Sequence, residues 1–269
     1  MTSSPASAAS SARKGGAAIK GHIERKAPWE IALLRKANRL VAEALKAVAA
    51  QVKPGVRTLD LDTFAEEYLR RRGATPAFKG YRNYPFSLCV SVNEEVVHGL
   101  PSERRLKDGD IVSLDLGNIV EGYYGDSALT VPVGEVTEEA SRLLRVTEEA
   151  LMRGIGAARL GGHLSDISHA VQTHVEGHGF SVVRIFVGHG IGKALHEDPQ
   201  IPNYGPPGRG PRLKPGMVLA IEPMVNAGGP DVEILPDNWT AVTKDRLLSA
   251  HFEHTIALTE EGVEILTQV

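Results

Sequence analysis

The chain contains a single cysteine, Cys89, in its 269 residues. One thiol cannot form an internal disulfide and cannot supply a cysteine-based zinc module, so neither device stabilises this protein. A chain of this kind suits a reducing compartment, and we expect it to be cytoplasmic. The sequence also lacks any apolar run of about 18 residues, which is the length a membrane-spanning helix needs.

A basic surface is missing as well. The formal net charge is −3, and the only run of cations is Arg70–Arg72, which is followed by Gly73 and is typical of a helix end. We therefore expect no specific nucleic acid and no membrane as a partner. The hydrophobic content of 42% is enough to build a core, so the composition indicates an ordinary globular protein.

The first 22 residues differ in composition from the rest. They are rich in serine, alanine and glycine and contain no acidic residue, so they cannot bury enough apolar surface to offset their chain entropy. We expect residues 1–22 to be a disordered tail and residues 23–269 to be a single folded domain. An alternative is that the basic, serine-rich tail directs import into an organelle.

Helical and strand-like patterns alternate along the domain. Apolar residues at helical spacing predict helices over 28–52, 58–73, 137–160 and 165–177, and the apolar runs at 87–92 and 110–117 predict strands. This alternation indicates an α/β or α+β fold.

The pattern also repeats within the chain. A shift of 106 residues aligns the second predicted helix with the fourth, and a shift of 107 aligns LKDGDIVSLD with LKPGMVLAIE. The second alignment places Asp115 against Glu222. A duplicated α/β unit, with an acidic residue at the end of an equivalent strand in each half, explains this similarity. Chance likeness between two amphipathic segments is the alternative.

Carboxylates occur inside apolar strands. Asp115 alternates with apolar neighbours, and a chain reversal around Val120 and Glu121 would place it opposite Asp126 on one face of a hairpin. Two adjacent carboxylates repel each other, so a divalent cation or a shared proton must neutralise them.

Two further carboxylates and one imidazole suit the same site. Glu222 and Glu253 each interrupt an apolar run, where an isolated charge is costly unless it is paired or coordinated. With His189, the set offers four carboxylates and one imidazole, which suits two divalent ions. Internal salt bridges to arginine or lysine are the alternative.

The segment GHGIGKALHEDPQIPNYG at 188–205 contains His189 and His196 among glycines and prolines. These residues disfavour a helix, so both histidines are expected on a loop or strand edge. A simple surface turn would explain them equally well in isolation. We expect the glycines to let the backbone and a substrate approach each other closely.

Seven blocks in a fixed order resemble the type I methionine aminopeptidases of peptidase family M24, and the likeness extends from about residue 23 to 269. The blocks are GYRNYP (80–85), NEEVVHG (93–99), SLDLGN (113–118), GYYGDSALT (122–130), the segment at 188–205, IEPM (221–224) and WTAVTKDRLLSAHFEHT (239–255). The resemblance implies a single-domain pita-bread fold, in which two pseudo-symmetric α/β halves surround a curved, mainly antiparallel sheet.

The resemblance also implies roles for individual residues. It implies that two divalent metal ions (cobalt, manganese, iron or zinc) are bound by Asp115, Asp126, His189, Glu222 and Glu253, with Asp126 and Glu253 bridging them. Catalytic contacts to the scissile peptide would come from His98 and His196, and Glu222 would move the proton. The methionine pocket would be formed by Tyr81, Tyr84, Cys89, Phe78, Leu195 and Trp239. Phe78 and Leu195 depart from the cysteine and phenylalanine that the family often has there.

The implied activity is removal of the N-terminal methionine from nascent or newly made chains with a small second residue, close to the ribosome, by attack of a metal-activated water on the first peptide bond. We expect a monomer. Two rivals stand beside this interpretation: a related peptidase that cleaves before proline, and a binding module that has lost the chemistry. Four further histidines are expected to be structural or surface residues: His174, His178, His251 and His254.

Overall fold

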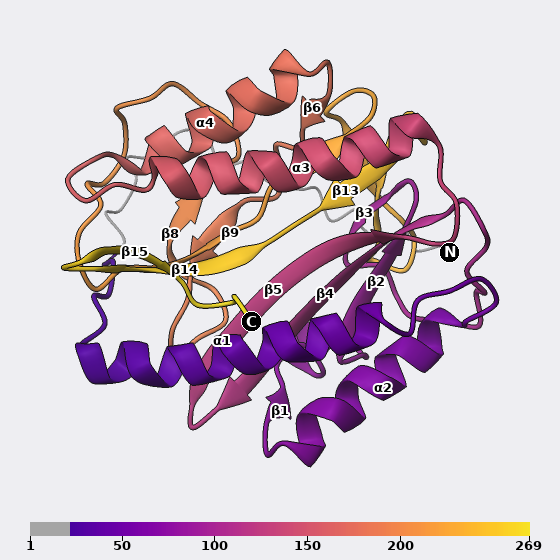
Figure 1. The fold of residues 1–269 in the computed structure, drawn as a ribbon, viewed down its shortest axis with the longest axis horizontal. Coiled ribbons are helices and arrows are strands. Elements are labelled where there is room, and N and C mark those ends of the chain that lie inside the picture. The colour runs from indigo at the N-terminus through magenta and orange to yellow at the C-terminus, as the bar shows by residue number, and fades with distance from the viewer. Residues whose placement is uncertain (1–21) are drawn as a thin grey trace, which may run out of the picture.

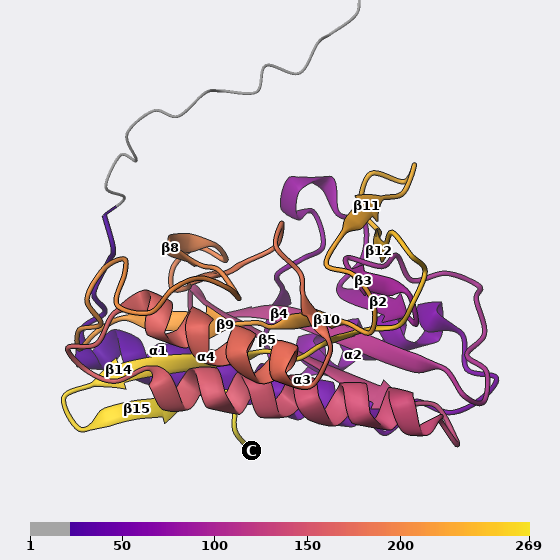
Figure 2. The same cartoon turned by 90° about the horizontal axis from the view of Figure 1, so that it is seen from above.

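Four helices lie on one face of a set of strands in the computed structural model, which describes residues 22–269 (Figures 1 and 2). Strands β8, β11 and β12 project from the opposite face. The predicted tail, except His22, lies outside the described residues. The four helices are α1 (Pro28–Ala49), α2 (Thr58–Arg71), α3 (Glu138–Ala157) and α4 (Leu164–Gly177).

The apolar side of each helix decides how it packs. In α1, Leu34, Val41, Leu45 and Val48 recur at spacings of three, four and seven and are all buried. Pro28 is the first helical residue, where its missing N–H costs nothing. All four helices fall within the ranges predicted from periodicity, except that α4 begins one residue earlier.

The strands are mostly short. They are β1 (Thr75–Pro76), β2 (Leu88–Val92), β3 (Glu95–Val97), β4 (Ile111–Val120), β5 (Tyr123–Pro132), β6 (Ser181–Val182), β7 (Gly188–Gly190), β8 (Glu197–Ile201), β9 (Val218–Ile221), β10 (Met224–Asn226), β11 (Val232–Ile234), β12 (Ala241–Thr243), β13 (Ser249–His251), β14 (His254–Thr259) and β15 (Gly262–Ile265). A 3₁₀ turn, η1, spans Tyr81–Asn83.

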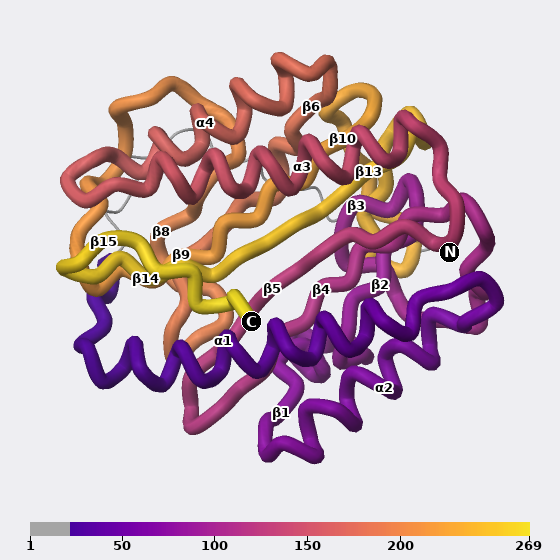
Figure 3. The backbone as a smooth tube through the Cα atoms, viewed as in Figure 1, coloured from indigo at the N-terminus to yellow at the C-terminus, as the bar shows by residue number. Residues whose placement is uncertain are grey.

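Every pair of these strands is antiparallel, but they form four hydrogen-bonded pieces instead of one continuous sheet. The two largest pieces are β2–β4–β5, with β1, and β15–β14–β9–β7–β8. They meet where Glu253 N–H donates to the Ala128 carbonyl at 2.8 Å. Figure 3 shows β14 running beside β5 at this junction. The expected fold class, with two α/β halves around antiparallel strands, is confirmed.

The internal repeat predicted from the sequence corresponds to the elements. Helix α4 begins and ends 106 residues after α2, since Thr58 and Leu164 begin them and Arg71 and Gly177 end them. Strand β9 begins at Val218, which is 107 residues after the first residue of β4, Ile111. The two halves therefore share element order and spacing.

The predicted hairpin register is wrong by two residues. Strands β4 and β5 do form a hairpin, but Asp115 pairs with Ala128, and Asp126 pairs with Gly117. The turn is formed by Glu121 and Gly122, which both have positive φ (51° and 82°), as a two-residue type I′ turn requires. Moving the turn by one residue shifts the pairing by two, so both carboxylates still face the same side.

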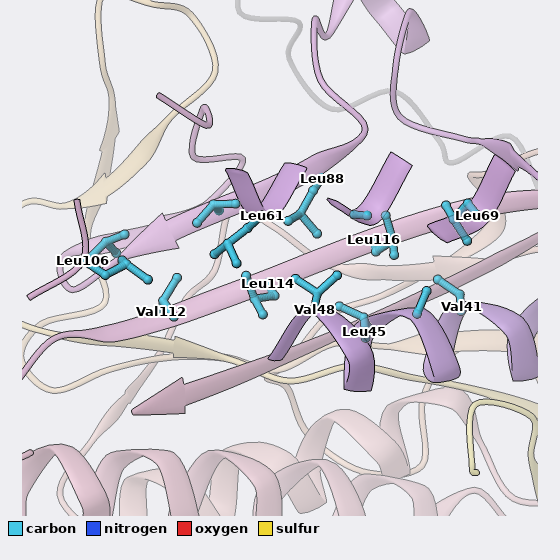
Figure 4. Close-up of a cluster of buried hydrophobic side chains, with 14 of the residues drawn as sticks. Val41, Leu45, Val48, Leu61, Leu69, Leu88, Leu106, Val112, Leu114 and Leu116 are labelled. Atoms are coloured by element: carbon cyan, nitrogen blue, oxygen red, sulfur yellow. The ribbon is translucent and has the colours of Figure 1, made fainter. Parts of the chain in front are cut away.

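Strand β4 separates the core from the other face of the sheet. Val112, Leu114 and Leu116 point to the helices and pack with α1 and α2 in the main apolar cluster (Figure 4). Because successive side chains alternate, Ser113 and Asp115 point to the face away from these helices. Among the described residues, no helix is long and apolar enough to cross a membrane.

We expect Leu114→Ala to lower the free energy of unfolding by about 3 kcal/mol, because the side chain is fully buried and the vacated space would remain as a cavity. Leu247→Ala removes the same atoms from a side chain that is 50% exposed and should change stability by less than about 0.5 kcal/mol. Urea unfolding of both variants measures the difference. Equal effects would contradict this account of the core.

Candidate metal centre

A row of side chains crosses the sheet at the junction of the two halves. Cys89 of β2 pairs with Asp115 of β4, Asp115 pairs with Ala128 of β5, and Ala128 is bridged to Glu253. Directly paired residues in antiparallel strands point to the same face of a sheet. The row therefore places a thiol and two carboxylates on one face, although Cys89 and Glu253 are far apart in the sequence.

Glu222 extends this row into the second half. Glu222 directly follows β9. His254 of β14 pairs with Ile221 of β9, so continuing this register by one residue places Glu253 opposite Glu222. The same register continues beyond Pro223, so that β10 and β13 remain paired. Glu222 thus projects on the same face as Glu253, on the neighbouring strand.

The remaining two predicted ligands, Asp126 and His189, lie outside the row, each displaced from it by two residues along a strand. Asp126 lies two residues from Ala128 on β5, so it shares that face. His189 of β7 pairs with Ala220, which lies two residues from Glu222. The His189 Nε2 atom is 3.7 Å from Asp126 Oδ2 and 3.5 Å from Glu222 Oε1. One face thus gathers four carboxylates and one imidazole from five strand positions.

A cavity of about 290 Å³ opens over this face. All thirteen residues that the sequence indicated as site residues line it: Asp115, Asp126, His189, Glu222, Glu253, His98, His196, Tyr81, Tyr84, Cys89, Phe78, Leu195 and Trp239.

The carboxylates carry an electrostatic cost that the described residues do not offset. Burial raises the pKa of Asp115 to about 7, and it raises the pKa of Asp126, Glu222 and Glu253 well above the usual range, with the neighbouring carboxylates adding to the effect. Among residues 22–269, Asp115 Oδ1, Asp126 Oδ1 and Glu253 Oε1 are buried without a hydrogen-bond partner. Such oxygens fit a divalent cation, which would neutralise them.

His189 is held in the form that a metal ligand requires. Its Nδ1 lies 2.9 Å from the Gly190 carbonyl, which accepts only if Nδ1 carries the proton. That tautomer leaves a lone pair on Nε2, the atom that faces the carboxylates. Burial lowers the pKa of His189 to about 3, so the ring is neutral. The donor set and its protonation state together suit divalent metal binding.

The backbone on both sides of His189 requires glycine. A Cβ on Gly188 would overlap the Ala220 carbonyl of β9, and one on Gly190 would overlap the Asp198 carbonyl of β8. Both glycines therefore let the neighbouring strands approach β7.

A buried ion pair anchors the loop that follows β7. Lys26 Nζ lies 2.6 Å from Glu197 Oε2, and the lysine side chain is almost completely buried. The same carboxylate accepts the Ala194 N–H at 3.1 Å. The loop that carries Leu195 and His196 is thereby attached to the chain segment just before α1.

His196 is oriented from the opposite side of the cavity. Its Nδ1 lies 2.8 Å from the Tyr81 hydroxyl in η1, and its ring is 4.4 Å from that of His189. If the tyrosine donates to Nδ1, the proton of the neutral ring resides on Nε2 and is free to be donated. Burial lowers the pKa of His196, which favours this neutral form.

His98 lies at the other end of the cavity. It follows β3 in a left-handed conformation (φ 60°), which is uncommon for a residue other than glycine and often occurs at functional sites. Its ring makes edge contacts with Phe186 at 5.3 Å and Trp239 at 6.4 Å. Burial lowers the pKa of His98 to about 4, so it too is neutral.

The apolar part of the cavity is formed around Tyr84 and Cys89. The centroid of the Tyr84 ring is 5.0 Å from that of Trp239, and the Tyr84 hydroxyl lies 3.1 Å from the carbonyl oxygens of Leu88 and Gly99, between which its single proton is shared. Phe78 reaches the site because Gly117 has no side chain there; a Cβ would lie 2.5 Å from the phenylalanine ring. These residues enclose an apolar slot next to Asp115.

Several lining residues were missed by the sequence interpretation. Ile185, Phe186, Val187 and Met224 line the cavity, and of these only Met224 lies within one of the motif blocks. His251 does not line the cavity, but its Nε2 is 3.7 Å from Glu222 Oε2. Its position two residues before Glu253 in a strand could have indicated that both face the same side.

A second group of possible metal ligands lies outside the cavity. Glu149 of α3, His174 of α4 and His178, which directly follows α4, bring their side chains together. The Glu149 carboxylate already accepts from Arg145 at 3.2 Å and lies 3.0 Å from His174 Nε2. This group has partners within the protein, in contrast to the buried carboxylates.

The chain is similar to known metallopeptidases in sequence. Residues 32–260 match the model of metallopeptidase family M24. A methionine aminopeptidase 1 of Bacillus subtilis (strain 168) is 57% identical over 244 residues, which are 91% of this chain and 98% of that protein.

Solved structures agree with the sequence comparison. The structure of a methionine aminopeptidase from Thermotoga maritima has a TM-score of 0.91 and 51% identity, and one from Rickettsia prowazekii has a TM-score of 0.91 and 42% identity; both likenesses cover 92% of this chain and 100% of the other. A prolidase from Pyrococcus furiosus is less similar, with a TM-score of 0.75 and 26% identity, and 65% of that chain is covered.

We expect the stabilisation by added Mn²⁺ to increase as the pH rises from 5 to 7.5. In the metal-free protein, burial raises the pKa of Asp115 from 3.8 to about 7. Between these two values the folded protein binds a proton that the unfolded chain has released, so the stability of the metal-free protein falls as the pH rises. The same proton competes with the metal, so metal binding strengthens over this pH range. Burial also lowers the pKa of the cavity histidines, to about 4 in His98 and about 3 in His189, and these histidines are present with and without metal, so their contribution cancels in the difference. Thermal unfolding with and without Mn²⁺ measures this difference.

Asp126→Asn should reduce the Mn²⁺-dependent rise in Tm at every pH, because it removes one of the buried carboxylates. Asp60→Asn is the matched control, since Asp60 lies on the surface of α2 and pairs with Arg57. A pH-independent effect of the metal, or equal effects of the two variants, would contradict the assignment of the carboxylates as its site.

Proposed function

Because the chain belongs to metallopeptidase family M24, we propose that its buried carboxylate cluster serves the removal of N-terminal methionine from peptides and newly made proteins. The observation that carries the proposal is the juxtaposition of this cluster with an apolar slot and two neutral histidines in one cavity. Carboxylates suit metal binding, the slot suits an unbranched apolar side chain, and the histidines suit contacts to a peptide bond.

Five residues would hold the metal: Asp115, Asp126, His189, Glu222 and Glu253. We propose two divalent ions, because four negative ligands balance two doubly charged cations, and one ion would leave the buried charge partly uncompensated. Cobalt, manganese, iron and zinc all accept such oxygen and nitrogen donors. The chemistry that these ions supply is Lewis acidity, which lowers the pKa of a water molecule and polarises a carbonyl oxygen.

The protein's own residues would then complete the reaction. Glu222 would take the proton of the attacking water at a carboxylate oxygen and deliver it to the leaving amine. His196, with its tautomer set by Tyr81, would donate from Nε2 to the carbonyl oxygen as negative charge develops there. His98, from the other end of the cavity, would contact the scissile peptide.

Selectivity would follow from the row described above. Cys89 is paired with Asp115, so the apolar slot directly adjoins the metal ligands. A methionine side chain in the slot would contact the rings of Tyr84 and Trp239, and a thioether contact with an aromatic ring contributes about 0.3–1.5 kcal/mol. The substrate's free amine would lie beside the carboxylates, which restricts cleavage to the first peptide bond.

We propose that the protein is a cytoplasmic monomer that acts on newly made chains as they leave the ribosome. The single cysteine supports this location. Cleavage before proline is the rival activity, and the T. maritima likeness covers the whole of that chain whereas the prolidase likeness is partial.

Initial rates with a Met-Ala-Ser peptide and an Ala-Pro peptide test the activity. We expect Mn²⁺-loaded protein to cleave only the first, and Glu222→Gln to lower kcat by about 10²- to 10⁴-fold, because the proton acceptor is lost. Glu149→Gln, outside the cavity, is the matched control and should retain the wild-type rate. Full activity of Glu222→Gln would refute the role of Glu222, and preference for Ala-Pro would refute the substrate.

Tyr81→Phe should lower kcat toward the value of His196→Ala, about 10²-fold below wild type, because the hydroxyl that sets the imidazole tautomer is lost. The two changes should be non-additive when combined, since both act on one donor. Steady-state kinetics of the single and double variants provide the test. Additive losses would show that Tyr81 acts independently of His196.

A further inference from the structure

His251 is a buried imidazole with no hydrogen-bond partner for its ring. The residue is 1% exposed, and among the described residues neither Nδ1 nor Nε2 has a partner. A buried polar atom without a partner destabilises the folded protein, so an apolar residue at this position would be more stable unless the ring has a use. The role of Glu222 in the reaction does not by itself account for this histidine.

The surroundings of Glu222 indicate what that use is. Its carboxylate lies between two imidazoles, with His189 Nε2 at 3.5 Å from Oε1 and His251 Nε2 at 3.7 Å from Oε2. His189 donates its one proton from Nδ1 to the Gly190 carbonyl, so its Nε2 cannot donate to Glu222. His251 has no such bond, and its neutral ring is free to carry the proton on Nε2.

The strand register holds His251 in this position. It is paired with Met224 and lies two residues before Glu253, so it belongs to the same face as the carboxylates. Its backbone N–H donates to the Thr130 hydroxyl at 2.9 Å, and its carbonyl accepts from that hydroxyl at 2.8 Å. These bonds fix the main chain of His251 against β5, while the ring keeps both nitrogens available.

We propose that His251 is a positioning residue that donates from Nε2 to Glu222 Oε2 and so directs Oε1 of that carboxylate toward the metal. The distance of 3.7 Å exceeds a hydrogen bond, and a small rotation of the glutamate side chain closes it. Partners of this kind hold a ligating carboxylate in one orientation and typically change metal affinity 10- to 100-fold when removed. The inference rests on the proposed function only in taking Glu222 as a metal ligand.

The experiment compares His251→Leu with His251→Gln by calorimetric titration of Mn²⁺ into metal-free protein. Leucine removes the donor, whereas the glutamine amide nitrogen takes nearly the position of histidine Nε2 and retains an N–H. All proteins carry Glu149→Gln, which removes the surface group of Glu149, His174 and His178 as a competing metal site. We expect the leucine variant to bind Mn²⁺ about 10- to 100-fold more weakly and the glutamine variant to remain within about threefold of wild type.

Thermal unfolding of the metal-free proteins separates positioning from a merely structural role. Both ring nitrogens of His251 lack a hydrogen bond at the observed distances, and the bond to Glu222 closes only when that carboxylate turns toward the metal. Leucine should therefore leave the metal-free Tm unchanged or higher while metal affinity falls. A structural role predicts a lower metal-free Tm. His254→Leu is the matched control, because its Nδ1 is bonded to Thr267 at 2.7 Å and it faces the opposite side of the strand; Mn²⁺ affinity should be unaffected.

Two results would overturn the proposal. One is Mn²⁺ affinity in His251→Leu equal to wild type, and the other is an equal loss in the leucine and glutamine variants. A separate measurement tests the proposed function: if metal-loaded protein with His251 intact does not cleave Met-Ala-Ser, the proposed function is wrong. If His251→Leu does not fold, the glutamine variant decides alone, since a loss of affinity beyond about tenfold there contradicts donation from Nε2.

Discussion

The concentration of negative charge on one buried face is the constraint on which the rest of this structure depends. Four carboxyl groups, from Asp115, Asp126, Glu222 and Glu253, lie within one small cavity, and three of them leave an oxygen without a protein partner. In the described part of the chain, no lysine or arginine forms an ion pair with any of the four. A fold can keep such a group only if something from outside neutralises it, so the site is incomplete without a ligand. The surrounding histidines, which burial keeps neutral, add donors without adding cations.

Strand register is the means by which distant residues reach this face. Cys89, Asp115, Ala128, Glu253 and Glu222 follow one another across neighbouring strands, and the row passes from one half of the repeat to the other at the Ala128–Glu253 bridge. Helices α1 and α2 pack from behind, where the alternate residues of β4 are apolar, and α3 and α4 pack mainly against strands of the second half. A single layer of strands thus separates the apolar core from a face where buried charge is costly. The two halves share element order and spacing, and each supplies an acidic residue at the same place, Asp115 in one and Glu222 in the other.

Much of this arrangement could be predicted from the sequence, because periodicity and burial report on the side to which a residue points. Isolated acids in apolar runs identified Asp115, Glu222 and Glu253, and helical spacing identified the four helices. The hairpin pairing was wrong because the turn was centred one residue too early; the Glu121–Gly122 pair, with glycine suited to positive φ, was the better signal. Ile185 and Phe186 belong to the cavity only through tertiary folding, and nothing in their neighbours indicates it. His251 was missed although its spacing from Glu253 carried the information.

The row of paired residues also decides which kinds of genetic change this protein can tolerate. Because faces alternate along a strand, a deletion or insertion of one residue within β5, or within the paired strands β10 and β13, would turn some of the acids toward the helices and bring apolar side chains to the open face. A single substitution changes one side chain. Adding or removing one residue in a strand exchanges the side chains of both faces of the sheet. The length of each strand segment beside the acids is therefore as much a part of the inherited information as the acids themselves, and a change of length in a loop outside the row leaves the pairing intact.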